Sequence, residues 1–123
     1  MKENVIVDKT FRFSVGIVKL YQYLTETRKE FVLSKQLLKC GTSIGANVEE
    51  AVGGISRKDF IAKLQIAYKE SRETKYWFKL LQATGYINLS DFDALDNDLE
   101  EIIKILISIL NSSKKGSNNT LNS

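Results

Sequence analysis

The run of residues 34–81 constrains the fold more than the rest of the chain, because two helical patterns meet within it at Gly53-Gly54. Apolar and small residues that recur every three or four positions form one face of a helix. The stripe before the glycines contains Leu37, Gly41, Ile44, Val48 and Ala51, and the stripe after them contains Phe60, Leu64, Ala67, Ser71, Phe78 and Leu81. Glycine adopts the left-handed conformation without strain, so Gly53-Gly54 is expected to end the first helix of this pair.

Two further segments show the same periodicity. One follows Asp8, a good N-cap residue, and carries Phe13, Ile17, Leu20 and Leu24. The other opens at Ser90 and carries Phe92, Leu95, Leu99, Ile102, Leu106 and Ile109. The third of the four segments opens with Ser56 and Asp59, a variant of the capping box. Four helices with short connections predict an all-α, antiparallel up-down four-helix bundle.

The predicted bundle occupies residues 8–112. Residues 1–7 are expected to form an N-terminal extension. Residues 113–123 are rich in Ser, Asn, Lys and Gly, which predicts a disordered tail. A chain of 123 residues is one domain on length.

The composition favours a reducing compartment and excludes a membrane span. Cys40 is the only cysteine, so no disulfide can form within the chain. No signal peptide is evident at the N-terminus. The most apolar stretch, 102–110, is interrupted by Lys104 and is too short to cross a bilayer. These features predict a cytoplasmic protein with no membrane partner.

The residue types argue against catalysis. The chain has no histidine, which removes His-dependent nucleophile systems and leaves Cys40 as the only thiol or imidazole ligand for zinc. The adjacent pairs Glu49/Glu50 and Glu100/Glu101 each point about 100° apart on a helix, so neither pair can converge on one site. The glycines of residues 41–45 lack the Gly-Lys-Ser/Thr ending of a phosphate loop. We therefore expect no enzyme activity, no metal, no cofactor, and a buried, inert Cys40.

Charge is divided unevenly along the chain. Residues 56–85 hold seven Lys or Arg and three acids, whereas residues 86–111 hold six acids and one Lys. Two interpretations remain open: adjacent antiparallel helices of opposite charge attract each other, or the basic helix presents a binding face.

A basic stripe runs along the third predicted helix. It consists of Lys58, Lys69, Arg72, Tyr76 and Lys79, and the uncharged Gln65 lies on the same face. Cations interleaved with an aromatic ring suit a phosphate backbone and a stacked base. The alternative is an ordinary solvated face with local ion pairs such as Lys69–Glu73 and Lys75–Glu70.

The third and fourth helices also carry apolar residues outside their core stripes. These are Trp77, Leu80, Ile103, Ile105, Ile107 and Leu110. A helix that is apolar over much of its circumference is buried on more than one side. Self-association through Trp77, Leu80, Ile103, Ile105 and Ile107 is one interpretation, and scattered exposed residues or additional core are the other.

The stretch 42–51, with Gly53-Gly54 and residues 56–60, resembles the four-helix bundle family of 23S rRNA intervening-sequence proteins. The matching residues are Ser43, Ile44, Asn47, Val48, Glu50, Ser56, Phe60, Leu64, Ile66, Ala67, Ser71 and Glu73. The chain has Glu49 and Ala51 where the common pattern has Ala and Gly. The related accessory proteins of diversity-generating retroelements are basic pentameric barrels that bind nucleic acid and contact a reverse transcriptase.

This resemblance implies a homopentamer, favours nucleic-acid binding and supplies no catalytic residues. The sequence thus predicts a non-enzymatic oligomeric bundle that binds the RNA or DNA backbone through the basic stripe. The alternative is a scaffold that binds a protein partner and has no nucleic-acid role.

Overall fold

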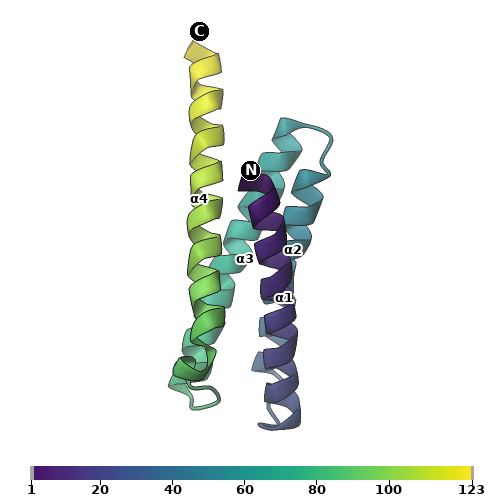
Figure 1. Cartoon of the computed structure of the whole chain (residues 1–123), viewed down its shortest axis with the longest axis vertical. Helices are drawn as coiled ribbons and strands as arrows, with labels where there is room; N and C mark the ends of the chain where they lie inside the picture. Colours follow the sequence, from purple (N-terminus) through teal and green to yellow (C-terminus); the bar gives the residue numbers. More distant parts are fainter. Residues whose placement is uncertain (1, 123) are drawn as a thin grey trace.

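The structure is a computed structural model that describes the backbone of residues 2–122 and the side chains of residues 5–88 and 90–113. It contains α1 (Lys2–Glu26), α2 (Leu33–Val52), α3 (Arg57–Ala83) and α4 (Asp93–Asn122), with a short 3₁₀ turn η1 (Leu89–Phe92) before α4. The helices alternate in direction, so both chain ends lie toward the same end of the bundle (Figure 1). The predicted all-α antiparallel four-helix bundle is confirmed.

Each helix packs against its neighbours in the sequence, and α4 also packs against α1, which closes the bundle. The buried core contains most of the stripe residues predicted from periodicity, including Phe13, Ile17, Leu37, Ile44, Leu64, Phe78, Leu99 and Leu106. Phe60, Phe92 and Leu95 are partly buried and pack against it. No helix within residues 2–122 combines the length and apolar character that crossing a membrane requires.

The first helix starts earlier than the Asp8 cap predicted. The structure includes residues 2–7 in α1, and Ile6 is buried in the core. Asp8 pairs instead with Arg12 one turn later. The residues 1–7 expected to form an extension therefore belong largely to the helix, because Ile6 lies seven residues before Phe13 and continues its apolar face.

The fourth helix continues to Asn122, where a disordered tail was expected from residue 113. It extends past the ends of the other helices (Figure 1). Ser113, the last residue whose side chain is described, is buried, and its hydroxyl accepts a hydrogen bond of 3.0 Å from Arg57. This contact joins α4 to the start of α3 beyond the predicted limit of the bundle.

The structure confirms the predicted start of α3 at Ser56 and contradicts the predicted conformation at the end of α2. The Ser56 hydroxyl accepts a hydrogen bond from the Asp59 backbone N–H at 3.1 Å, as the capping-box pattern predicted. Gly53 has φ −83°, and Gly54 does not have a positive φ either, so the left-handed ending predicted for Gly53-Gly54 is wrong. At Gly54, a Cβ atom would lie 3.0 Å from the carbonyl oxygen of Ala51, which favours a residue without a side chain. The left-handed glycine is Gly85, which follows α3 with φ 82°.

Candidate nucleic-acid interface

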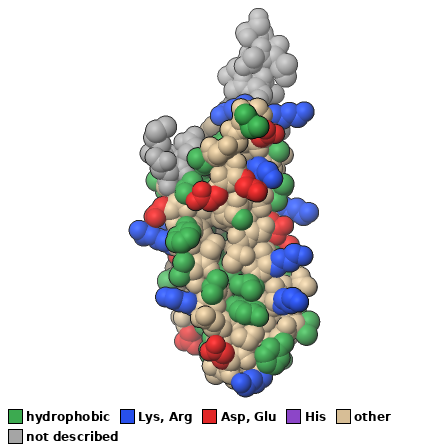
Figure 2. Space-filling model, turned by 90° about the vertical axis from the view of Figure 1, so that its right-hand side faces the viewer, with side chains coloured by type: hydrophobic (Ala, Val, Ile, Leu, Met, Phe, Trp, Pro, Cys, Tyr) green, Lys and Arg blue, Asp and Glu red, His purple; other side chains and the backbone are tan. Residues whose placement is uncertain are grey.

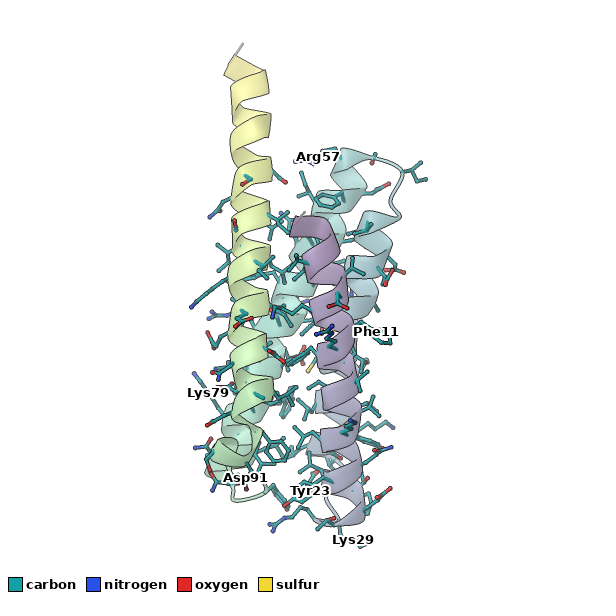
Figure 3. All side chains as sticks on the ribbon, in the orientation of Figure 1. Phe11, Tyr23, Lys29, Arg57, Lys79 and Asp91 are labelled. Atoms are coloured by element: carbon teal, nitrogen blue, oxygen red, sulfur yellow. The ribbon has the colours of Figure 1, made fainter. Side chains whose placement is uncertain are left out.

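The basic stripe lies on the outer face of α3. Its five predicted members, Lys58, Lys69, Arg72, Tyr76 and Lys79, are all exposed. The opposite face of the helix carries the buried residues Leu64, Ala67, Ser71, Thr74, Phe78 and Leu81. Lys79 projects from one side of the bundle and Phe11 of α1 from the other (Figure 3). Packing of the core face therefore fixes the stripe toward solvent.

Two cations of α3 pair with carboxylates of neighbouring helices. Lys75 lies 2.8 Å from Asp96 and 2.8 Å from Glu100 of α4, and Lys63 lies 3.3 Å from Glu50 of α2. Within the described side chains, the four cations of the basic stripe form no ion pair with a carboxylate. The pairs Lys69–Glu73 and Lys75–Glu70, which the alternative of a solvated face suggested, do not form. Among the described side chains, Lys75 thus forms the ion pairs between α3 and α4, and the stripe cations stay outside these pairs.

Carboxylates border the basic stripe. Glu73 is exposed on α3 one position beyond Arg72, and Glu100 of α4 is close enough to Arg72 for that guanidinium to contribute to a lowered pKa of Glu100, whose main cause is the hydrogen bond from Lys75. These carboxylates narrow the positive surface near Arg72. The basic stripe itself runs along the helix axis for about 30 Å between Lys58 and Lys79.

Tyr76 is the exposed aromatic ring of the stripe, with 57% of its surface accessible. Its ring meets Trp77 at 5.3 Å between centroids and 74° between planes. Trp77 in turn donates a hydrogen bond of 3.4 Å from Nε1 to Glu73 Oε1. Two contacts thus restrain an aromatic pair beside Arg72 and Lys79.

The predicted self-association residues lie in different environments. Ile103 is only 7% exposed and belongs to the core of the single chain, so its assignment to an interface is wrong. The Ile103 side chain packs in the core between the helices instead of facing outward. Trp77, Leu80 and Ile105 are half-buried, and Ile107 is exposed.

An exposed apolar stripe on α1 was not predicted. It consists of Phe11, Val15 and Val18, of which Phe11 is 64% exposed. Their spacing of four and three positions was readable from the sequence, but a four-helix pattern gives each helix only one expected apolar face. Figure 2 views the side of the molecule where α1 and α2 lie and shows hydrophobic side chains gathered there between charged ones.

A polar cavity of about 200 Å³ lies between α2 and α3. Its lining residues are Gln36, Lys39, Cys40, Ser43, Glu70 and Glu73. Burial, and then the neighbouring charge of Glu73, raises the pKa of Glu70.

Cys40 is buried, with 2% of its surface exposed. Burial raises the pKa of its thiol to about 11, and Thr74 donates a hydrogen bond to its sulfur. A thiol with this pKa is a poor nucleophile at neutral pH, which agrees with the prediction that Cys40 is buried and inert.

A second, more open groove of about 370 Å³ lies between α1 and the start of α4. Leu20, Phe92 and Leu95 supply apolar surface, and Arg12 and Lys19 face Asp91 and Asp98 across it. Neither this groove nor the polar cavity contains a nucleophile paired with a base. Among the described residues, no group of three or more Cys, Asp or Glu side chains is placed to hold a metal ion.

Comparison with known proteins identifies a family model and similar solved structures. The family model described as 23S rRNA-intervening sequence protein matches residues 2–108. A solved structure, described as a protein of unknown function from the S23 ribosomal protein family of Bacteroides thetaiotaomicron, is 53% identical with a TM-score of 0.87. The similarity covers 90% of this chain and 99% of that one. No curated protein matches.

Proposed function

The chain belongs to the family of 23S rRNA-intervening sequence proteins, and from that membership we propose that it is a non-enzymatic oligomer that binds RNA or DNA through backbone phosphates. The observation that supports this function is the group of four exposed cations on α3, Lys58, Lys69, Arg72 and Lys79, which have no carboxylate partner among the described side chains. Unneutralised cations in a row attract a polyanion, and its condensed counterions are released on binding.

Exposed apolar surface supports the oligomeric part of this proposal. The exposed Phe11 stripe of α1 and Ile107 of α4 are apolar surfaces that a second copy could cover. A homopentamer, which the family resemblance favours, would repeat the basic stripe five times. Several weak contacts to one strand then combine into avidity, provided that the strand reaches more than one copy.

Binding to RNA and DNA at several salt concentrations tests the proposal. The parent protein should bind both, and affinity should fall as salt rises. Lys69→Glu with Arg72→Glu should weaken binding to many sequences alike, since phosphate contacts do not read bases. Lys63→Glu is not a suitable control because Lys63 pairs with Glu50. Lys29→Glu with Lys35→Glu, at two exposed lysines outside α3, matches the change in charge and should bind more like the parent.

A protein-binding scaffold is the second candidate, supported by the groove between α1 and α4. Its apolar floor and its opposed charges suit an amphipathic peptide better than a polyanion. If the reversed stripe variant stays assembled and binds nucleic acid as tightly as the parent does, the stripe is only a solvated face. A parent protein that binds neither RNA nor DNA would favour the scaffold.

A further inference from the structure

We propose that the strand bound on the basic stripe is single-stranded, with one unpaired base stacked on Tyr76 and its neighbouring phosphates on Arg72 and Lys79. This inference rests on the proposed function and names the class of nucleic acid that the site takes.

Arg72, Tyr76 and Lys79 lie on the same face of α3. Arg72 lies four positions before Tyr76 and Lys79 lies three after it, so all three share one helix face within about 10 Å along the axis. All three are exposed. An aromatic ring with a cation one turn away on each side offers a stacking surface between two phosphate contacts.

Trp77 restrains the ring of Tyr76. Trp77 meets the Tyr76 ring in a nearly perpendicular contact, and Trp77 is itself held by its hydrogen bond to Glu73. A perpendicular neighbour positions the tyrosine without covering it with a parallel ring, and more than half of the residue stays accessible. An aromatic ring that is already positioned loses less conformational freedom when a base stacks on it.

The charged surface around Arg72 suits one phosphate backbone better than two. Glu73 and Glu100 border the stripe near Arg72, so a second phosphate backbone beside the first would meet carboxylates. In a duplex the base faces are stacked on each other, which leaves Tyr76 without a partner. An unpaired strand can use both the cations and the exposed ring.

Trp77 provides the readout because it is the only tryptophan of the chain and contacts Tyr76 directly. The full-length protein is titrated with oligo(dT), oligo(U) and a DNA duplex of equal length, each carrying a fluorescent label. Affinity is followed by anisotropy of the label, and stacking by the emission of Trp77. We expect the single strands to bind more tightly than the duplex and to change the Trp77 emission.

Three variants separate stacking from charge. Tyr76→Ala should lower single-strand affinity about tenfold, within the range measured for loss of one base–aromatic contact, and should leave duplex affinity unchanged. Tyr76→Phe should bind like the parent. Phe31→Ala, which removes an exposed aromatic ring from the α1–α2 loop, is the matched control and should also bind like the parent.

The outcomes distinguish this inference from the function on which it rests. Equal binding of duplex and single strand, together with an unaffected Tyr76→Ala variant, would overturn the stacking site and leave phosphate binding intact. Absence of binding to every oligonucleotide would overturn both. Binding of only oligo(U) or only oligo(dT) supports the site and shows that it distinguishes the two strands by the 2′-hydroxyl or by the thymine methyl group.

Discussion

Glu30 lies in the loop between α1 and α2, and its carboxylate takes the place of the side-chain N-cap that α2 lacks. Oε1 accepts the backbone N–H groups of Val32 at 3.1 Å and Leu33 at 2.7 Å, and Oε2 accepts that of Ser34 at 2.9 Å. The residue is only 7% exposed. One buried anion thus satisfies three donors at the positive end of a helix dipole.

Glu30→Gln should destabilise the protein by about 1–3 kcal/mol at pH 7, because the amide leaves buried donors without an acceptor. Chemical denaturation monitored by circular dichroism measures the change. The exposed Glu26→Gln at the end of α1 is the control and should change stability by less than about 0.5 kcal/mol.

The effect of Glu30 should depend on pH. Burial alone would raise the pKa of this carboxyl, but the hydrogen bonds from Ser34, Leu33 and Val32 outweigh it and lower the pKa below 4.5. A lowered folded-state pKa contributes stability above the unfolded pKa, and this contribution is lost as the pH falls through the folded value. The gap between parent and Glu30→Gln should therefore narrow below about pH 4.5; a gap that stays constant to pH 2 would contradict this role.

At the scale of the helices, α1 and α2 approach closely because α2 carries a glycine at the contact. A Cβ atom on Gly41 would lie 2.9 Å from three side-chain atoms of Ile17, which is fully buried and cannot move aside. Gly41→Ala should cost about 1–3 kcal/mol from overpacking, in spite of the better helix propensity of alanine.

The matched control for this contact is Gly53→Ala, where the added Cβ would lie 3.6 Å from the Glu49 carbonyl oxygen in ordinary contact. Thermal unfolding compares the two variants. If Gly41→Ala is as stable as the control, the two helices separate easily and the close contact is not required for the fold.

The pairing of α3 with α4 depends in part on Lys75, which bridges Asp96 and Glu100. Lys75→Met should cost about 1 kcal/mol, because it removes two ion pairs and leaves two carboxylates facing each other. Lys79→Met removes a cation without such partners and should leave the free energy of unfolding unchanged. Urea denaturation of both variants checks the difference.

The pH dependence of the Lys75 bridge has the opposite sign to that of Glu30. Burial alone would lower the pKa of Lys75, but the hydrogen bonds to Asp96 and Glu100 outweigh it and raise the pKa above 10.5. A raised pKa contributes stability below the unfolded value that is lost as the pH rises through the folded one. The difference between parent and Lys75→Met should therefore persist at pH 9 and decline above about pH 10.5.

For the whole molecule, the exposed apolar surface predicts assembly. Light scattering at micromolar concentration should give the mass of an oligomer for the parent protein. Phe11→Lys or Ile107→Lys should shift the mass downward while circular dichroism stays unchanged, because an unpaired charge is costly inside an interface but not in solvent. Ile55→Lys, at a residue that is 98% exposed in the α2–α3 turn, is the control. A parent protein that is monomeric under these conditions would remove the assembly from the proposal.

The sequence by itself determined the helices and their buried faces. Apolar spacing identified the four core stripes, and the Ser56 cap marked the start of α3, because these depend on residues within a few positions of one another. The same local information placed Lys58, Lys69, Arg72, Tyr76 and Lys79 on one solvent face. Local patterns were less informative at the ends of α1 and α4, where the helices begin and end differently from the prediction.

Only the tertiary structure decided what each outward residue contacts, because ion pairs and burial between helices join residues far apart in the sequence. It assigned Lys75 to Asp96 and Glu100, left the stripe cations without carboxylate partners among the described side chains, and buried Ile103. It also showed that Phe11 lies uncovered. A helical wheel gives the direction of a side chain, but whether a neighbouring helix occupies that direction depends on how the four helices pack together.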